Sequence, residues 1–305
     1  MAWITCWQRI ESIYTMADIE KMQPEEFAQE KTTVWDFPVR GAWATHKPDY
    51  RGNFAPQIPR NVILNYTNEG DFVLDPMIGS GTTLIEARLL NRNAVGYDVN
   101  QNAVNITSER IRFEIKGNAK QIVKLGNAQK LSEKDSSVDL VIAHPPYANI
   151  VKYSDGKNPD DLSSISSLPK FLDALEIAVR EMYRVLKPGK YCAILIGDTR
   201  KGQHFIPLSH FVLERCLRSG FALKEEVIKT QHNTTHAPRW SASAKHYKFY
   251  LIMHEHLFIF RKPDVGENLT RIQYSTWKGL QKAKAVEEEE EWKGLLDWEN
   301  KKSKK

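Results

Sequence analysis

Two segments of the chain carry side chains whose types and spacing could do chemistry. The first runs Asp75-Pro76-Met77-Ile78-Gly79-Ser80-Gly81-Thr82-Thr83, directly after the apolar residues 72–74. Its glycines allow the backbone to approach a ligand closely, and the start of a following helix adds unpaired N–H groups. The spacing matches neither the dinucleotide pattern nor a P-loop. Because the carboxylate of Asp75 would repel phosphate and attract an ammonium group, the segment predicts a site for a cationic ligand.

A second carboxylate ends the next apolar segment. Asp98 closes residues 94–98 and lies roughly twenty residues further on, where an acid can accept hydrogen bonds from both hydroxyls of a ribose. Together the two acids favour a cationic nucleoside such as S-adenosylmethionine over a dinucleotide. The alternative is that the glycines only form a tight turn and that Asp98 only caps a strand.

The other chemical segment is His144-Pro145-Pro146-Tyr147, which follows the apolar residues 138–143. Two consecutive prolines fix the backbone and remove two N–H donors, so the carbonyl groups face outward without a strand partner. These carbonyl groups can accept hydrogen bonds from an exocyclic amino group, and Tyr147 can stack on the base that carries it. Reaching such an amine in a duplex requires flipping the base out. A Pro-Pro turn with a packed tyrosine is the alternative.

Alternating strands and helices must position these segments. Such alternation predicts an α/β fold with a doubly wound, mostly parallel, seven-stranded sheet. We expect irregular structure over 34–61, a helix start near 23–27, and a helix end at Lys187-Pro188-Gly189. Strands are expected at 72–74, 94–98, 122–125, 138–143, 191–196, 223–230 and 247–261, and helices at 83–90, 168–186 and 207–218.

Composition and charge exclude several classes of protein. Hydrophobic residues make up 41% of the 305 residues, and the net charge of +5 permits a polyanionic partner without requiring one. We expect no membrane segment, because no apolar run approaches about 18 residues, and no signal peptide. The three cysteines lack any paired spacing, so we expect no disulfide framework and a cytoplasmic location. We also expect no metal site, since Pro238 argues against a helix that would align His232 with His236.

The two chemical segments resemble those of the amino-group (N6-adenine or N4-cytosine) DNA methyltransferases, which have a Rossmann-like fold and use S-adenosylmethionine. The resemblance covers residues 34–262 and includes Trp43-Ala44-Thr45-His46, residues 51–59 and Gly126-Asn127-Ala128. It implies that residues 75–82 line the methionine side of the cofactor, that Asp98 holds the ribose and that Asn127 approaches the adenine. The cofactor-binding residues implied are Asn53, Asp75, Pro76, Gly79, Ser80, Gly81, Thr82, Asp98 and Asn127.

The same resemblance gives His144, Pro145, Pro146 and Tyr147 the catalytic role of holding the target amine. Family members usually have Asp, Asn or Ser at the position of His144. An imidazole can accept a hydrogen bond from an amine only while it is neutral. The histidine leaves adenine and cytosine both open as targets, and we favour adenine.

The chain divides into three predicted regions. Residues 1–33 form a lead-in, residues 34–262 the catalytic domain, and residues 263–305 a charged accessory tail with an exposed helix or loose structure. Within the domain, residues 149–167 are expected to close over the flipped base, and residues 229–248 to recognise the target. The substrate-binding candidates are Lys152, Tyr153, Gln231, Asn233, Arg239 and Trp240.

The resemblance implies a DNA methyltransferase acting on double-stranded DNA as a monomer or homodimer. It can be solitary or paired with a cognate restriction endonuclease. Two other readings compete with it. One is an RNA or protein amino-methyltransferase, because guanine-N2 and glutamine methyltransferases also use x-Pro-Pro-Tyr. The other is a non-catalytic nucleic-acid-binding module that retains the fold.

Overall fold

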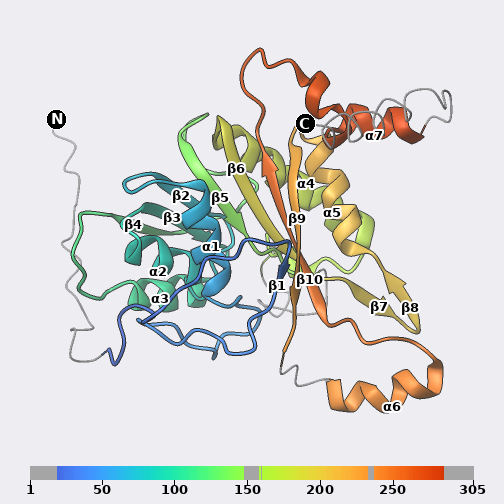
Figure 1. The fold of residues 1–305 in the computed structure, drawn as a ribbon, viewed down its shortest axis with the longest axis horizontal. Coiled ribbons are helices and arrows are strands. Elements are labelled where there is room, and N and C mark those ends of the chain that lie inside the picture. The colour runs from blue at the N-terminus through green and yellow to red at the C-terminus, as the bar shows by residue number, and fades with distance from the viewer. Residues whose placement is uncertain (1–18, 148–157, 159, 233–236, 285–305) are drawn as a thin grey trace, which may run out of the picture.

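The computed structural model describes residues 19–147, 158, 160–232 and 237–284. Its centre is an eight-stranded sheet in the order β1-β9-β10-β6-β5-β2-β3-β4 (Figure 1). Its strands are β1 (Val34–Trp35), β2 (Phe72–Asp75), β3 (Asn93–Asp98), β4 (Gln121–Leu125), β5 (Val138–Ala143), β6 (Leu186–Ile196), β9 (Ala222–Thr230) and β10 (His254–Arg261). Only β10 runs antiparallel to its neighbours, so the sheet is mostly parallel, as predicted.

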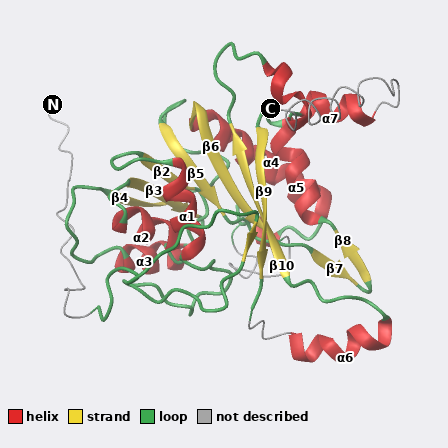
Figure 2. Cartoon of the chain, viewed as in Figure 1, coloured by secondary structure: helices red, strands yellow, loops and turns green. Residues whose placement is uncertain are grey.

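Helices cover both faces of this sheet (Figure 2). They are α1 (Gln57–Tyr66), α2 (Thr82–Leu89), α3 (Gln101–Arg110), α4 (Leu168–Val185), α5 (Leu208–Arg218), α6 (Ala237–Tyr247) and α7 (Trp277–Lys284), with short 3-10 helices η3 (Leu162–Ser164) and η4 (Leu269–Ser275). A separate hairpin is formed by β7 (Thr199–Lys201) and β8 (His204–Ile206). Among the described helices, none has both the length and the apolar character needed to span a bilayer.

The core is split into two layers by the alternation of side chains along each strand. Val73 packs in a cluster with α1 and α2 on one face, whereas its neighbour Leu74 packs in a cluster with α4 and α5 on the other. Both side chains are fully buried. The central strands must therefore be apolar on both faces, which explains why they read as short continuous apolar runs.

The strand order changes direction at β2. This strand pairs in parallel with β3 on one side and with β5 on the other, where Val73 faces Leu140 and Leu74 faces Val141. The carboxyl ends of β2, β3 and β5 therefore lie next to one another. In open parallel sheets a crevice forms at such a reversal, and ligands bind there.

The seven predicted strands and the three predicted helices are confirmed, but several details of the sequence analysis were wrong. An eighth strand, β1, pairs with β9 at the sheet edge. Residues 23–27 form no helix, because Gln23 is held instead by hydrogen bonds to Leu89 and Arg60. Helices α1 and α3 were not expected.

Three further boundaries differ for physical reasons. Pro238 is the second residue of α6, where a helix has no need of its N–H group. Helix α4 already ends at Val185 and strand β6 begins at Leu186, so residues 187–189, expected to end the helix, lie within the strand. Strand β10 begins only at His254. In the tail, Trp277 and Leu280 of α7 pack against the core beside α5, so this part is not loose.

Candidate active site

A cleft that is partly open to solvent lies at the carboxyl ends of β2, β3 and β5. Asp75 ends β2, Asp98 ends β3 and His144 follows β5, and all three line the cleft. The predicted site residues that line it are Asn53, Asp75, Pro76, Gly79, Ser80, Thr82, Asp98, Asn127, His144 and Pro146. The two chemical segments thus meet in one cavity.

Asp75 is almost completely buried at the cleft wall, with 2% of its surface exposed. Its carboxylate accepts hydrogen bonds from the Thr83 hydroxyl at 2.5 Å and from the backbone N–H of Met77 at 3.0 Å. Burial raises the pKa of Asp75 to about 7, although these hydrogen bonds act in the opposite direction. A nearby cation would stabilise the ionised form.

The turn between β2 and α2 requires glycine. Gly79 and Gly81 have positive φ angles of 50° and 85°, a region that other residues rarely adopt. A Cβ atom on Gly81 would lie 2.7 Å from the Thr107 side chain, whose hydroxyl donates to the Gly79 carbonyl at 3.0 Å. Helix α3 therefore packs directly against the turn and fixes its shape.

Asp98 is held in place by the same turn. Its carboxylate accepts hydrogen bonds from the backbone N–H groups of Gly79 at 3.0 Å and Asn100 at 2.9 Å. Burial raises the pKa of Asp98 to about 6, and the neighbouring carboxylate of Asp161 adds to the increase. Two carboxylates with raised pKa values at adjacent strand ends are typical of a site that binds a polar or cationic ligand.

The segment 51–59 closes one side of the cleft. The Asn53 amide donates to the Ser80 hydroxyl at 3.2 Å, which joins this segment to the glycine turn. Phe54 stacks on the His144 ring, with 5.3 Å between the ring centroids. Asn127, on the side of β4, accepts a hydrogen bond from the backbone of Gln129 at 2.8 Å and presents an amide to the cleft.

Residues 43–46 anchor the loop that leads into this segment. The buried carboxylate of Glu86, in α2, accepts hydrogen bonds from Trp43 Nε1 at 2.6 Å and from Arg60 at 2.8 Å. It also contacts the His46 ring at 2.7 Å. These residues do not line the cleft in the described part of the chain, so their contribution is to hold the loop.

The His144–Tyr147 segment is tied to the neighbouring strands by a network that the sequence did not reveal. His144 Nε2 lies 2.8 Å from the Tyr147 hydroxyl, which donates to Glu255 Oε1 at 2.5 Å. Glu255, in β10, forms a buried ion pair with Lys229 of β9 at 3.0 Å. The Tyr147 ring packs against Gly197, where a Cβ atom would lie 2.6 Å from the ring.

The imidazole of His144 is neutral at physiological pH. Burial lowers its pKa to about 4, and the positive charge of Lys229 contributes to the decrease. The Glu255 carboxylate and a hydrogen bond to the Gly52 backbone oppose the decrease without cancelling it. An imidazole can accept a hydrogen bond only while it is neutral. The ring of His144 stays neutral well below neutral pH.

Other predicted site residues lie elsewhere. Gly81, Pro145 and Tyr147 adjoin the cleft without lining it, and neither Gln231 nor Trp240 lines it among the described residues. Arg239 lies in α6. Lys152, Tyr153 and Asn233, with most of the predicted closing segment, are outside the described residues. Tyr50 lines the cleft and was missed, whereas Asp161 and Leu162, which also line it, belong to the predicted closing segment 149–167.

Glu255 is the most informative residue that sequence reasoning missed. The only signal for it was a charged residue between two histidines at the start of the otherwise apolar segment 254–261. Its partner Tyr147 lies 108 residues earlier, so no local pattern joins them.

The cleft fits S-adenosylmethionine. Two carboxylates suit the ammonium and ribose groups of this cofactor, and apolar residues that include Ile78, Val99 and Ala128 can contact its adenine and methionine portions. The tight glycine turn leaves room for a ligand close to the backbone.

Comparison with known proteins agrees with this fit. The profile of the family described as DNA methylase matches residues 6–109 and 138–305, and that of an RMKL-like methyltransferase domain matches residues 62–157. The type II methyltransferase M.HpaI of Haemophilus parainfluenzae is 43% identical over 93 residues, which are 28% of this chain and 27% of the relative. The tRNA (guanine(10)-N2)-dimethyltransferase of Pyrococcus abyssi is 32% identical over 154 residues, 47% of this chain and 41% of the relative.

The chain thus spans less than half of the length of these two curated relatives. A solved S-adenosylmethionine-dependent methyltransferase from Methanosarcina mazei is 19% identical with a TM-score of 0.48, over 67% of this chain and 98% of that chain. Because the DNA methylase profile matches most of the sequence, the chain belongs to the N6/N4 DNA methylase family of S-adenosylmethionine-dependent methyltransferases.

Proposed function

We propose that the protein methylates an exocyclic amino group of a base in DNA, N6 of adenine or N4 of cytosine, and we favour adenine. The observation that carries this proposal is that Asp75 and Asp98 line the same cleft as His144 and Pro146. A cofactor held by the first pair would present its reactive group toward an amine held by the second. The family profile that matches most of the chain, described as DNA methylase, supports DNA as the substrate.

The cofactor-side residues would bind and orient S-adenosylmethionine, which supplies an electrophilic methyl group when bound. Asp75 would stabilise its ammonium group, and Asp98 would accept hydrogen bonds from its ribose. The segment that contains Asn53 and Phe54 would cover the cofactor and keep water out of the cleft. Asn127 would contact the adenine.

The target side would hold and orient the amine. The outward carbonyl groups of the Pro-Pro segment accept the hydrogens of the amine and direct its lone pair into the cleft. After methylation the amine must lose a proton. A methylated, protonated amine conjugated to an aromatic ring is a strong acid, so water at the open side of the cleft can take up that proton.

The contacts of His144 fix the orientation of its ring. One ring nitrogen faces the oxygen of Tyr147, whose own proton is donated to Glu255, and the ring also has a hydrogen bond to the Gly52 backbone. Because both nitrogens are engaged in this way, His144 would shape the target side of the cleft and position Tyr147.

A second surface, formed by the β7–β8 hairpin, α6 and the segment after α6, is suited to nucleic acid. Exposed aromatic residues of the β8 strand, α6 and the following segment lie among basic residues: Phe205, Trp240, Tyr247 and Tyr250 with Lys201, Lys245 and Lys248. Arg200 joins the hairpin to this segment, because it stacks on Phe249 with 4.8 Å to the ring centroid and donates to the Tyr250 carbonyl at 2.7 Å. Basic groups hold phosphates and aromatic rings stack on unpaired bases. We propose that this surface, together with residues 229–248, contacts the target.

The experiment is transfer of labelled methyl groups from S-adenosylmethionine into duplex DNA, transfer RNA and protein, followed by mass spectrometry of the digested nucleosides. We expect N6-methyladenine or N4-methylcytosine from DNA. The Pro146→Ala and Tyr147→Ala variants should bind the cofactor normally and transfer no methyl groups. Transfer into RNA or protein alone, or cofactor binding without turnover on any genomic DNA, would overturn the proposal.

RNA is the second candidate substrate. The tRNA dimethyltransferase of Pyrococcus abyssi aligns with 154 residues of the chain, a longer stretch than the 93 residues of M.HpaI. Its named target is also an exocyclic amine. The transfer RNA arm of the experiment separates the two candidates. Pairing with a cognate restriction endonuclease, and a monomeric or dimeric state, remain predictions.

A further inference from the structure

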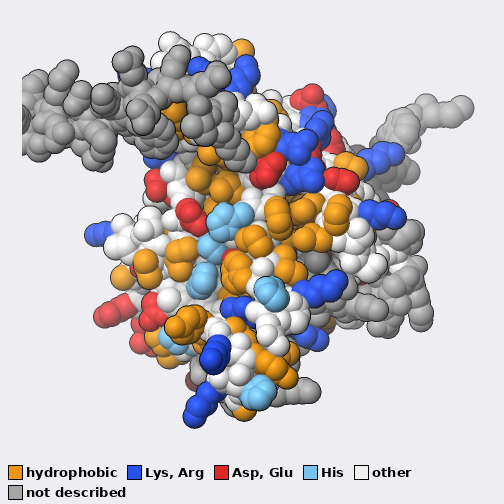
Figure 3. All heavy atoms as spheres, turned by 90° about the vertical axis from the view of Figure 1, so that its right-hand side faces the viewer, with side chains coloured by type: hydrophobic (Ala, Val, Ile, Leu, Met, Phe, Trp, Pro, Cys, Tyr) orange, Lys and Arg blue, Asp and Glu red, His pale blue; other side chains and the backbone are white. Residues whose placement is uncertain are grey.

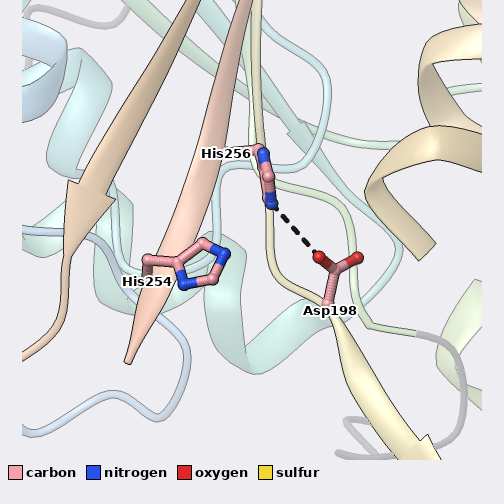
Figure 4. A group of neighbouring side chains, drawn as sticks. All are labelled: Asp198, His254 and His256. Carbon is pink, nitrogen blue, oxygen red and sulfur yellow. Dashed lines mark hydrogen bonds and ion pairs between the residues drawn. The ribbon is translucent and has the colours of Figure 1, made fainter. Parts of the chain in front are cut away.

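Behind the target side of the cleft, three potential metal ligands converge (Figure 4). They are Asp198, which follows β6, and His254 and His256 of β10. We propose that these residues bind a divalent transition-metal ion of the zinc type. The inference does not depend on the substrate of the enzyme. Histidine side chains lie near one another on one face of the molecule (Figure 3).

The distances suit such an ion. One ligand atom from each of the three residues lies within 4.8 Å of the others, and His256 Nε2 is 3.1 Å from Asp198 Oδ2. Zinc binds histidine nitrogen and carboxylate oxygen at about 2.0–2.2 Å, so two tetrahedral ligands lie roughly 3.3 Å apart. The His256–Asp198 pair is already at that spacing. A small rotation of the His254 ring would complete a three-ligand set with an open fourth position.

The outer contacts of the ligands also match those of a metal site. His256 Nδ1 lies 2.8 Å from Glu226 Oε1 on β9, which directs the other ring nitrogen toward Asp198. A carboxylate behind a ligating histidine fixes the tautomer and the ring orientation. The backbone N–H of Ser209 donates to Asp198 Oδ1 at 2.8 Å and leaves Oδ2 directed at the histidines.

His254 distinguishes this cluster from a simple ion pair. Without a cation, His256 forms ion pairs with both Asp198 and Glu226, and these pairs alone account for the positions of the three side chains. It does not explain His254, whose half-buried ring packs 5.1 Å from the His256 ring and has no hydrogen-bond partner in the described part of the chain. The carboxylates of Asp198 and Glu226 carry two negative charges, which would balance a divalent cation bound with two neutral histidines.

The position of the cluster gives the ion a structural role. Glu255, which holds Tyr147, lies between the two histidine ligands on β10, and Gly197, on which Tyr147 packs, precedes Asp198. Side chains alternate along a strand, so Glu255 points to the opposite face from His254 and His256. An ion would tie the ends of β6 and β10 together and fix both supports of Tyr147.

The sequence alone predicts no metal site, because the pair His232 and His236, four residues apart, has no further ligand in its segment. Asp198 and His256 are 58 residues apart, and only the pairing of β6 with β10 brings them together.

The test is titration of the full-length, tag-free protein, stripped with chelator, with Co²⁺ as a spectroscopic probe and Zn²⁺ as competitor. We expect one equivalent of Co²⁺ to give the visible absorption of a nitrogen- and oxygen-ligated site, and Zn²⁺ to displace it. The His254→Gln variant should lose this absorption while its circular dichroism is unchanged, because His254 makes no hydrogen bond that the fold needs. The Glu226→Gln variant should bind about 10- to 100-fold more weakly.

The matched control is His204→Gln, an exposed histidine on β8, which should bind Co²⁺ like the wild type. Zn²⁺ should raise the melting temperature of the wild type and of His204→Gln, but not that of His254→Gln. Absence of a saturable one-equivalent site would overturn the proposal and leave an ion pair only. Undiminished binding by folded His254→Gln would overturn the assignment of the ligands.

Discussion

The hydroxyl of Tyr147 donates a 2.5 Å hydrogen bond to Oε1 of Glu255, which lies 108 residues further along the chain. This bond connects the Pro-Pro-Tyr segment after β5 to the antiparallel strand β10. The other oxygen of the same carboxylate is paired with Lys229 at 3.0 Å. The orientation of Tyr147 therefore depends on a buried ion pair contributed by the last two strands of the sheet.

Replacement of Glu255 tests this dependence. We expect Glu255→Gln to lower kcat by at least about tenfold, because the amide weakens the contact with Tyr147 and leaves Lys229 without its counter-charge. The affinity for S-adenosylmethionine should change less than about twofold, since Glu255 does not line the cleft. Single-turnover kinetics and calorimetry separate the two quantities.

A double variant controls for stability in this experiment. Glu255→Gln combined with Lys229→Met removes both buried charges, so its unfolding free energy should recover relative to Glu255→Gln alone. Its kcat should stay low. Recovery of kcat together with stability would show that Glu255 acts only on folding.

Gly197 offers an independent way to displace the same tyrosine. A Cβ atom at this position would lie 2.6 Å from Tyr147 Cε2, so Gly197→Ala should move the ring and lower kcat at nearly unchanged cofactor affinity. The cost in unfolding free energy should be roughly 1–3 kcal/mol, as for overpacked sites. Gly202→Ala, in the nearby hairpin, meets no atom within 4 Å, but its φ of 61° makes alanine strained there, so this variant should lose stability without touching Tyr147 and serves as the control for kcat. Equal kcat values for the two variants would contradict the role given to Tyr147.

The cofactor side of the site could be predicted from the sequence because the residues that form it are close together in the chain. The strand, the acid at its end and the glycine turn are consecutive, and Asp75 and Asp98 end neighbouring parallel strands, as predicted. The target side was only partly readable. The position of His144 followed from the end of β5, but its neutral state depends on burial by Phe54 and on Lys229, which come from distant segments. Helix α6 was missed because Pro238 was read without its position in the first turn.

Cofactor affinity should rise with pH between 5.5 and 7.5. The pKa values of Asp75 and Asp98 are raised to about 7 and about 6, so both carboxyl groups are largely protonated at the lower pH and ionised at the higher one. Because only the ionised form attracts an ammonium group, calorimetry should show an increase of about tenfold over this range.

The Asp75→Asn variant tests the cause of that increase. It keeps the shape of the side chain but cannot ionise, so it should bind weakly and with a flatter pH dependence. Asp98→Ala should weaken binding at every pH, since it removes the group proposed to hold the ribose. Unchanged affinity in both variants would remove these residues from the cofactor site.

The stability of the protein in acid should reveal the neutral state of His144. Its pKa in the folded protein, about 4, lies below the usual value of 6.5, so the folded state resists protonation. Stability from this group is fully present above pH 6.5 and is lost as the pH falls toward 4. His144→Asn cannot take up the proton. The unfolding free energy of the wild type, relative to this variant, should fall by on the order of 2 kcal/mol between pH 7 and pH 4.5. Burial also lowers the pKa of His46, but that group is present in both proteins and cancels in the difference. Urea titrations of both proteins at several pH values measure this difference in unfolding free energy. A difference that does not vary with pH would mean that His144 is protonated as easily in the folded state as in the unfolded one.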